Sequence, residues 1–384
     1  MYTSETANED SERTAFRKAE KKYKLYYDTS KKRKHPKTVD LSDVIDFKAV
    51  LESYNQNGQL PEGVFAQGSD LYLPVFGLKS RPGFYFIPGA LTIKEQCRWI
   101  RESLTSFPQP PNRTNHNAIY GHIRDLFVAS KEGKILTEVE SLSKSNGSGV
   151  DVIEGNDPKW KFSEEQCVTS GGSSSKSVSA SVLLRKLRWS TLGLQFDWSK
   201  RSYNISLPHQ KIPDALCQLA KTLAAPAMPP GEVFQPEAAI VNYFSSGARR
   251  SWAISLITVL LSLPIKPNID VFLLPGDMLG GHLDDMEKDW SKPIVSLSLA
   301  CKAIFLLGGK TREDTPLAMF LRSGDIVLMA GEARECFHGV PRIFTDGGHA
   351  EISDLESCFS HEDDSSFLEY CRTSRININI RQVD

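Results

Sequence analysis

The chain has 384 residues, and its 46 lysines and arginines nearly balance 47 aspartates and glutamates, for a formal net charge of −1 at pH 7. This balance excludes a global positive field, so any affinity for nucleic acid has to come from local basic patches. The longest uncharged apolar stretch, 252–265, has 14 residues and is too short to cross a bilayer as a helix, so we expect no membrane partner.

The seven cysteines form no Cys-x-x-Cys pair and are odd in number. This pattern argues against a disulfide framework and a structural zinc site, and it favours a reducing compartment. The N-terminus also lacks the apolar segment of a secretory signal. We therefore expect an intracellular protein of the nucleus, the cytoplasm or both, with an organelle as an alternative. The sequence does not determine the oligomeric state.

Residues 1–75 are polar and basic, and they predict a partly disordered N-terminal region ahead of a folded domain over 76–384. From Glu12 to Asp40 the chain carries eleven basic and four acidic residues, a local net charge of +7. Its densest part, KKRKHPK at 31–37, suits nuclear import or contact with phosphates, and it equally suits a solvated tail.

The folded domain is expected to begin with a strand and a helix. FYFI at 84–87 has the composition of a strand, and LTIKEQCRWIRESL at 91–104 predicts a helix. Thr92 and Glu95 have the spacing of a capping box at its start. The apolar side chains that share one face of this helix are Ile93, Cys97, Ile100 and Leu104.

A Ser/Gly-rich stretch at 141–180 cannot bury much apolar surface and predicts a flexible surface insertion. After it, residues 185–201 interleave tryptophans with basic residues, a pattern that can stack bases and hold phosphates. Half-buried packing is the alternative for these tryptophans. The candidate nucleic-acid contacts are Arg188, Trp189, Trp198, Lys200 and Arg201.

The C-terminal third predicts short strands within 294–309, 316–331 and 375–383. Gly-Gly and Ser-Gly-Asp turns separate them without helical crossovers, which indicates an antiparallel sandwich or jelly roll. The expected fold class is mostly β with flanking helices, α+β.

Two His-x-Asp pairs occur in the chain, and their surroundings differ. His282 and Asp284 point to the same side if the segment is extended. His338, near the end of a later strand, could add a third ligand, and two histidines with one carboxylate form the facial triad of non-haem iron(II) oxygenases. His361 and Asp363 lie among acidic residues and serines with no histidine after them, so we interpret them as a solvated loop.

The last expected strand, RININIRQV, alternates apolar and polar residues with a period of two. On an outer sheet the polar row would be a solvated face. Inside a jelly roll, its guanidinium groups could hold a dicarboxylate. Alternation alone leaves both interpretations open. One face would carry Ile376, Ile378 and Ile380, and the other Arg375, Asn377, Asn379 and Arg381.

Four motifs in this order and spacing, NYF at 242–244, HLD at 282–284, HGVPR at 338–342 and RININIR at 375–381, resemble the AlkB family of Fe(II)/2-oxoglutarate-dependent dioxygenases. The flanks FKAV, RPGFYFIP, LRWSTLG and DWSKPIVSLSL resemble the subgroup of its first eukaryotic homolog. The resemblance covers most of residues 40–384, and it implies a double-stranded β-helix, or jelly roll.

The resemblance also assigns roles to residues. It implies that Fe(II) sits on His282, Asp284 and His338, that Arg375 holds the distal carboxylate of 2-oxoglutarate, and that Arg381 supports its other end. Asn242 matches an asparagine that contacts the co-substrate. The partner tyrosine of the family is Phe244 in this chain, so one hydrogen bond to the co-substrate is missing.

The activity implied is oxidative demethylation of N-methylated bases in DNA or RNA, including tRNA. The co-substrates are 2-oxoglutarate and dioxygen, and the products are formaldehyde, succinate and CO2. A methylated base has to leave its stack to reach buried iron, which makes residues 185–201 a candidate lid. The alternatives are a catalytically weak nucleic-acid-binding protein and a protein-directed oxygenase that acts on histone.

One segment departs from the family pattern. Asn242 and His282 are 40 positions apart, and the 29 residues of 248–276 account for most of that separation. Their removal would leave the compact hairpin that the resemblance implies. We interpret 248–276 as a translated intron or a gene-model error, in which case this chain would be a defective isoform, with a genuine insertion as the alternative. An abundant transcript with all 29 codons would exclude the intron.

Overall fold

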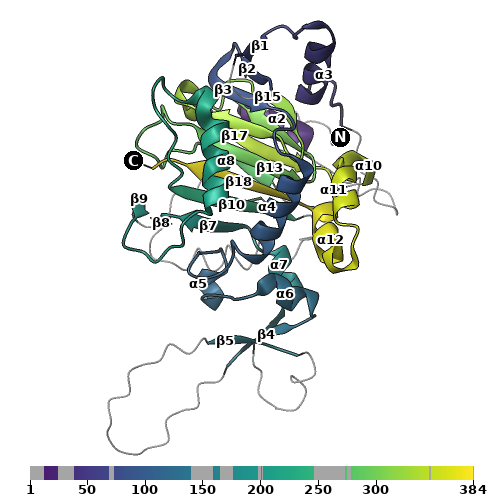
Figure 1. The fold of residues 1–384 in the computed structure, drawn as a ribbon, viewed down its shortest axis with the longest axis vertical. Helices are drawn as coiled ribbons and strands as arrows, with labels where there is room; N and C mark the ends of the chain where they lie inside the picture. The colour runs from purple at the N-terminus through teal and green to yellow at the C-terminus, as the bar shows by residue number, and fades with distance from the viewer. Residues whose placement is uncertain are drawn as a thin grey trace, which may run out of the picture.

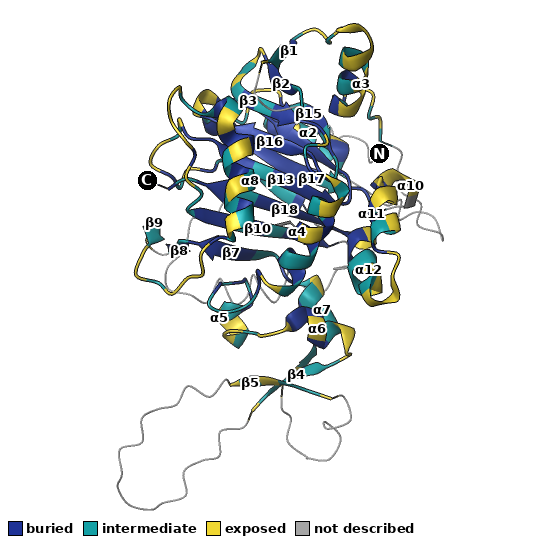
Figure 2. Ribbon diagram, in the orientation of Figure 1, coloured by how far each residue is buried: buried dark blue, intermediate teal, exposed yellow. Residues whose placement is uncertain are grey.

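Two antiparallel sheets lie face to face at the centre of the molecule, and both are largely buried (Figures 1 and 2). Side chains of both sheets form one apolar cluster between them, which includes Phe84, Phe305 and Val327. This arrangement confirms the predicted mostly β jelly roll with flanking helices. The computed structural model describes residues 13–24, 39–68, 73–139, 159–164, 176–197, 200, 202–245, 273–274, 278–345 and 347–383.

Every neighbouring pair of strands in the two sheets is antiparallel. The eight-stranded sheet has the order β1 (Val64–Gln67), β2 (Val75–Leu78), β3 (Arg81–Ile87), β16 (Ile326–Met329), β13 (Ile294–Ala300), β18 (Ser374–Arg381), β10 (Ala238–Ser245) and β7 (Trp189–Gly193). The five-stranded sheet has the order β11 (Leu273–Leu274), β12 (Met278–His282), β17 (His338–Ile343), β14 (Ala303–Leu307) and β15 (Leu317–Leu321).

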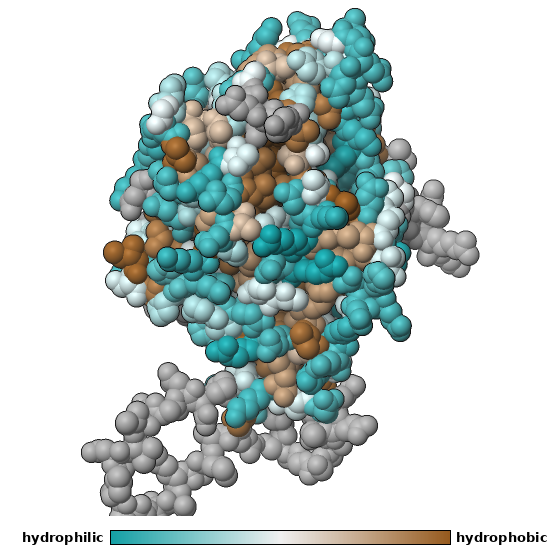
Figure 3. Space-filling view, viewed as in Figure 1, coloured by the Kyte–Doolittle hydropathy of each residue, from teal (hydrophilic) through white to brown (hydrophobic). Residues whose placement is uncertain are grey.

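Helices cover the outer face of each sheet. α4 (Ile93–Thr105) and α8 (Asp214–Ala224) lie across the eight-stranded sheet (Figure 1), and their outward sides contribute to the largely hydrophilic face in Figure 3. α2 (Ala15–Tyr23) packs on the five-stranded sheet. The capping box of α4 is confirmed, because Thr92 and Glu95 exchange hydrogen bonds at its first turn.

The remaining elements are short. Two small sheets have the orders β5 (Trp160–Ser163), β4 (Ile135–Glu138), β6 (Ser177–Ser179) and β8 (Gln195–Asp197), β9 (Ser202–Asn204). The other helices are α3 (Phe47–Asn57), α5 (Asn117–Tyr120), α6 (Leu126–Lys131), α7 (Ala180–Arg185), η2 (Ala225–Ala227), η3 (Gly331–Glu335), α10 (Gly347–Ala350), α11 (Ser353–Cys358), η4 (Glu362–Asp364) and α12 (Ser365–Thr373).

The alternation of β18 distributes its side chains between two environments. The three isoleucines are fully buried in the cluster beneath α4 and α8. The opposite side faces the space between the sheets, where Arg375, Asn377 and Arg381 are 1%, 6% and 3% exposed. The polar row therefore lies inside the jelly roll, and a solvated outer face is excluded.

Part of the basic N-terminal region packs on the jelly roll. Phe16 of α2 is fully buried, and the buried carboxylate of Glu20 accepts a hydrogen bond from the backbone N–H of Gly281 at 2.7 Å. β1 forms one edge of the eight-stranded sheet. Folded structure thus begins before residue 76. The basic segment 31–37 lies outside the described residues.

The Ser/Gly-rich stretch 141–180 is described only in part. Its residues 159–164 and 176–180 contain β5 and β6, which flank β4 in a small sheet that projects from the jelly roll at the bottom of Figure 1. The other residues of this stretch lie outside the described part of the chain, so its predicted flexibility stays a prediction.

The expected hairpin between Asn242 and His282 is wrong. β10, which carries Asn242, belongs to the eight-stranded sheet, whereas β12, which ends at His282, belongs to the five-stranded sheet. A jelly roll passes strands from one sheet to the other, so these strands lie across the core from one another. Of residues 248–276, the structure describes 273–274, which pair with β12, and the intron hypothesis stays untested.

Among the described helices, none is long and apolar enough to cross a membrane. The six cysteines within the described residues are free thiols.

Candidate active site

The three predicted metal ligands meet at one end of the five-stranded sheet. His282 is the last residue of β12, His338 is the first residue of β17, and the two lie directly opposite each other in the ladder. Asp284 follows β12 and brings its carboxylate 3.8 Å from Nε2 of His282 and 3.6 Å from Nε2 of His338. Their ligand atoms all lie within 4.8 Å of one another.

Hydrogen bonds to the backbone orient both imidazoles. Nδ1 of His282 is 2.9 Å from the carbonyl oxygen of Gly280, and Nδ1 of His338 is 3.2 Å from that of Cys336. A carbonyl only accepts, so each Nδ1 carries a proton, and Nε2 is the ring nitrogen available to a metal. Metal-binding histidines are commonly held in this way.

The geometry and charge of the triad fit a divalent metal. Ligands about 2.1 Å from one ion at adjacent octahedral corners are roughly 3.0 Å apart, so the two carboxylate–imidazole distances of 3.8 and 3.6 Å exceed this value by less than about 1 Å. Burial lowers the pKa of His282 to about 4, so this ring is neutral near pH 7. Burial opposes ionisation of Asp284, but the charge of Arg381 holds the pKa of this carboxyl well below its usual value.

The second His-x-Asp pair forms no such group. His361 and Asp363 are exposed beside the short helix η4, and Asp364 pairs there with Arg101 at 2.9 Å. Among the described residues, the triad of the jelly roll is the group that could hold a metal.

Arg375 lines the same cavity as the triad, together with Asn377 and Asn379. Its Nη2 donates to Oγ of Ser298 at 3.0 Å, while its buried Nε and Nη1 have no hydrogen-bond partner. Two unpaired donors of one guanidinium can form a bidentate pair with a carboxylate. Burial lowers the pKa of Arg375 to about 10, which leaves the group positively charged near pH 7. The donors therefore fit one end of a dicarboxylate such as 2-oxoglutarate.

The other predicted co-substrate residues have different neighbours. Arg381 places Nη2 3.0 Å from Oδ2 of Asp284 and Nε 3.3 Å from Oε1 of Glu287, so its observed contacts are with a predicted metal ligand and a second carboxylate. Asn242 lies opposite Asn377 in the β10–β18 ladder and donates to its side chain at 3.4 Å. The ring of Phe244 lies 5.3 Å from the guanidinium carbon of Arg375, so a cation–π contact occupies the place of the missing tyrosine.

The candidate nucleic-acid residues separate into two groups. Trp189 of β7 lies opposite Asn242, and residues opposite each other in a ladder share one face, so Trp189 shares the face of the co-substrate row. Arg188 is one residue earlier and on the other face, where Nη1 donates to the carbonyl oxygen of Arg185 at 3.0 Å. Lys200 is exposed between β8 and β9. The remaining two, Trp198 and Arg201, lie outside the described residues.

Three residues that sequence reasoning missed form a connected group beside Asp284. Glu287 and Arg334 are 5% and 2% exposed, and they form an ion pair of 2.6 Å. Tyr203 donates its hydroxyl to Glu287 at 2.7 Å. The available signal was an acid three positions after Asp284 and an arginine four positions before His338. Charges so close to ligands in a compact site are frequently part of their support.

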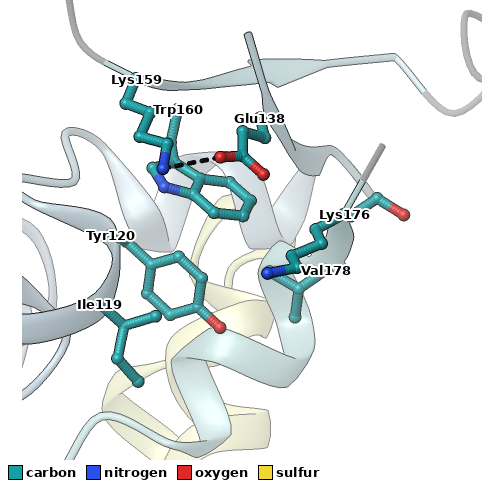
Figure 4. Close-up of a pocket in the computed structure, with 8 residues that line it drawn as sticks. Ile119, Tyr120, Glu138, Lys159, Trp160, Lys176 and Val178 are labelled. Carbon is teal, nitrogen blue, oxygen red and sulfur yellow. Dashed lines mark ion pairs between the residues drawn. The ribbon is translucent and has the colours of Figure 1, made fainter. Parts of the chain in front are cut away.

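A second hollow lies on the small sheet around β4 (Figure 4). Lys176 and an ion pair of 2.8 Å between Lys159 and Glu138 line it. The rings of Tyr120 and Trp160 meet edge to face with centroids 5.1 Å apart, so each partly covers the other. This hollow does not include the triad, and we assign the catalytic site to the jelly roll.

Comparisons with known proteins identify the family of the chain. Residues 83–381 match the family described as the 2OG-Fe(II) oxygenase superfamily. The chain is 59% identical over 388 positions to the DNA N(6)-methyladenine demethylase ALKBH1A of Arabidopsis thaliana, with 100% of both chains covered. It is 28% identical over 384 positions to the nucleic acid dioxygenase ALKBH1 of Homo sapiens, which covers 91% of this chain and 80% of the human protein.

A third relative is the tRNA demethylase abh1 of Schizosaccharomyces pombe, with 24% identity over 379 positions, 96% of this chain and 95% of the yeast protein. These matches confirm the resemblance that the four motifs carry. They also agree with an oxygenase that uses Fe(II), 2-oxoglutarate and dioxygen. The chain belongs to the 2OG-Fe(II) oxygenase superfamily and, within it, to the AlkB family.

Proposed function

We propose that this oxygenase removes N-methyl groups from bases of DNA or RNA, including tRNA. The observation that carries the proposal is one cavity lined by the triad and Arg375, with Trp189 on the face of the sheet that carries the co-substrate row. The relatives support it, because they are a DNA demethylase, a nucleic acid dioxygenase and a tRNA demethylase.

Bound iron with 2-oxoglutarate and dioxygen supplies the oxidation of the methyl group, which is then lost as formaldehyde. The protein has to hold and orient these reactants. His282, Asp284 and His338 would hold the metal, and Arg375 would hold the distal carboxylate of 2-oxoglutarate. All four are less than 9% exposed, so bulk water is largely excluded from the centre.

A base within a duplex cannot reach a centre this deep, so the substrate nucleotide has to leave its stack or belong to a single strand. Trp189 offers an aromatic surface beside Asn242, and such a surface stacks bases of any sequence. Lys200 of the neighbouring hairpin is exposed and can contact phosphate. We propose that β7 and the β8–β9 hairpin form the substrate side of the cavity.

The test is nucleoside mass spectrometry on methylated single-stranded DNA and tRNA stem-loops, incubated with Fe(II) and 2-oxoglutarate. Two proteins are compared, the full chain and a variant without residues 248–276. We expect loss of methyl groups with at least one of them, and formaldehyde in equal amount.

Activity of both proteins would make 248–276 a tolerated insertion. Activity of the shortened protein alone would identify the full chain as a defective isoform. If neither protein acts on nucleic acid, the proposal fails. The same assay on methylated histone peptides then tests whether the protein is an oxygenase that acts on histone. Retained oligonucleotide affinity without turnover on either substrate would indicate a binding protein.

We also propose that KKRKHPK at 31–37 directs the chain to the nucleus, because a short run of lysines and arginines can serve as an import signal. Replacement of Lys31, Lys32, Arg33 and Lys34 by glutamine should lower the nuclear-to-cytoplasmic ratio of a fluorescent fusion several-fold. An unchanged ratio would leave phosphate contact or solvation as the role of this segment, and residence in an organelle would contradict the proposal.

A further inference from the structure

The hydroxyl of Tyr203 reaches a buried carboxylate near the predicted metal site, from a hairpin outside the two large sheets. Tyr203 lies in β9, and its ring meets that of Phe196 in β8 edge to face at 5.2 Å. Its hydroxyl donates to Oε1 of Glu287 at 2.7 Å. Burial raises the pKa of Tyr203, so the hydroxyl stays protonated and remains a donor.

Glu287 is the centre of a buried group of charges that ends at a metal ligand. Its Oε2 accepts from Nη2 of Arg334 at 2.6 Å, and its Oε1 lies 3.3 Å from Nε of Arg381. Arg381 in turn places Nη2 3.0 Å from Oδ2 of Asp284. Arg334 also donates to the backbone carbonyl of Asp284 at 2.9 Å. We call Tyr203, Glu287, Arg334 and Arg381 the Glu287 cluster.

The charges of Asp284 and Glu287 balance those of Arg334 and Arg381, and all four side chains are buried. In this buried, low-dielectric environment, a charged group that loses its partner destabilises the folded protein. A displacement of one of the four charged groups therefore shifts the others. Without the hydroxyl of Tyr203, Oε1 of Glu287 loses its hydrogen bond of 2.7 Å. Its remaining partner is the charged Nε of Arg381, at 3.3 Å. Arg381 would then be drawn toward Glu287 and away from Asp284.

We propose that Tyr203 is a positioning residue for the metal ligand Asp284, and that through the Glu287 cluster it couples the β8–β9 hairpin to the metal centre. The coupling to substrate rests on the proposed function, in which this hairpin contacts nucleic acid. Binding linkage is reciprocal, so an oligonucleotide that fixes the hairpin tightens metal binding by the same factor by which metal tightens oligonucleotide binding.

The experiment compares Tyr203→Phe with the unaltered chain by titration with Mn(II) in the presence of 2-oxoglutarate, followed by electron paramagnetic resonance. We expect Tyr203→Phe to weaken Mn(II) affinity about three- to tenfold, because partners of metal ligands typically contribute 10- to 100-fold and Tyr203 acts through two intermediates. A second variant, Glu287→Gln, keeps the shape but removes the charge, and it should weaken Mn(II) affinity by more than Tyr203→Phe.

Tyr243→Phe is the matched control. Tyr243 is a fully buried tyrosine, whereas Tyr203 is half-buried, and the Tyr243 hydroxyl donates to the carbonyl oxygen of Ser103 at 2.6 Å. Its side chain lies in the apolar cluster beneath α4, away from the Glu287 cluster. Thermal melts of the metal-free proteins report any general loss of stability, and this control should keep the Mn(II) affinity of the unaltered chain.

Unchanged Mn(II) affinity in Tyr203→Phe would overturn the proposal, as would an equal loss in Tyr203→Phe and Tyr243→Phe. The coupling is measured by repeating the titration with an unmethylated single-stranded oligonucleotide. The oligonucleotide should tighten Mn(II) binding about fivefold or more in the unaltered chain and less than about twofold in Tyr203→Phe. Equal factors would refute the coupling to the hairpin. None of these readouts requires demethylation, so failure of the proposed function is detected separately.

Discussion

Replacement of Asp284 by alanine is expected to lower turnover more than about 100-fold, because changes in the partners of metal ligands alone cost 10- to 100-fold and Asp284 is itself a proposed ligand. The triad would keep its two imidazoles and lose its only carboxylate. Turnover is measured as succinate formed from 2-oxoglutarate and as methyl groups lost from an oligonucleotide. Oligonucleotide affinity, read by fluorescence anisotropy without metal, should stay within about threefold of the unaltered chain.

Asp285→Ala is the matched control. Asp285 is the next residue, carries the same charge and is exposed, so its loss changes the local net charge without removing a member of the triad.

Asp284→Ala also leaves Arg381 beside one buried carboxylate in place of two, and the expected loss of stability is a few kcal/mol. A thermal melt separates that loss from the loss of metal. A pure binding protein would show no turnover with or without either substitution and would keep its oligonucleotide affinity in both variants, and that outcome would contradict an enzyme.

The metal site could be predicted from the sequence because its information is local. His282 and Asp284 share one segment, and their spacing aims both side chains to the same side of an extended chain. The third ligand was the histidine that follows a strand of the C-terminal third. Local information also excluded the second pair, His361 and Asp363, as metal ligands. Acidic residues and serines surround this pair, and no histidine follows it.

The environment of β18 could not be predicted from its alternation, because what covers each face comes from distant parts of the chain. The isoleucine face is buried by α4 and α8, which begin 282 and 161 positions before Arg375. The polar face is buried because the five-stranded sheet closes over it. The Glu287 cluster is distributed in the same way, since Tyr203 and Glu287 are 84 positions apart and Arg334 is 47 positions further on. The hairpin expected between Asn242 and His282 failed because proximity in sequence does not decide whether two strands share a sheet.

Replacement of Arg375 by lysine is expected to raise the apparent KM for 2-oxoglutarate about 10- to 100-fold. Nε and Nη1 of Arg375 are the unpaired donors in the cavity, and lysine, a single point of charge, cannot reproduce a bidentate pair. One lost hydrogen bond to a charged group corresponds to about 1.5–3 kcal/mol. Arg375→Met, which removes the charge, should cost about 2–5 kcal/mol in 2-oxoglutarate binding. Succinate formation gives the apparent KM, and titration of the Mn(II)-loaded protein with 2-oxoglutarate gives the binding free energy.

Arg342→Lys is the control for this substitution. Arg342 lies on β17 with its guanidinium carbon 4.4 Å from the ring of Phe344, as Arg375 lies over Phe244, but it is not part of the cavity lining. Mn(II) affinity should stay close to normal in Arg375→Lys, because no ligand of the triad contacts this residue directly in the structure. Burial lowers the pKa of Arg375 to about 10. The affinity for 2-oxoglutarate should therefore stay constant from pH 7 to 9 and fall as the pH rises through about 10, where the guanidinium loses its charge. Unchanged 2-oxoglutarate affinity in Arg375→Lys would mean that the distal carboxylate binds elsewhere, and the polar row of β18 would then need another ligand.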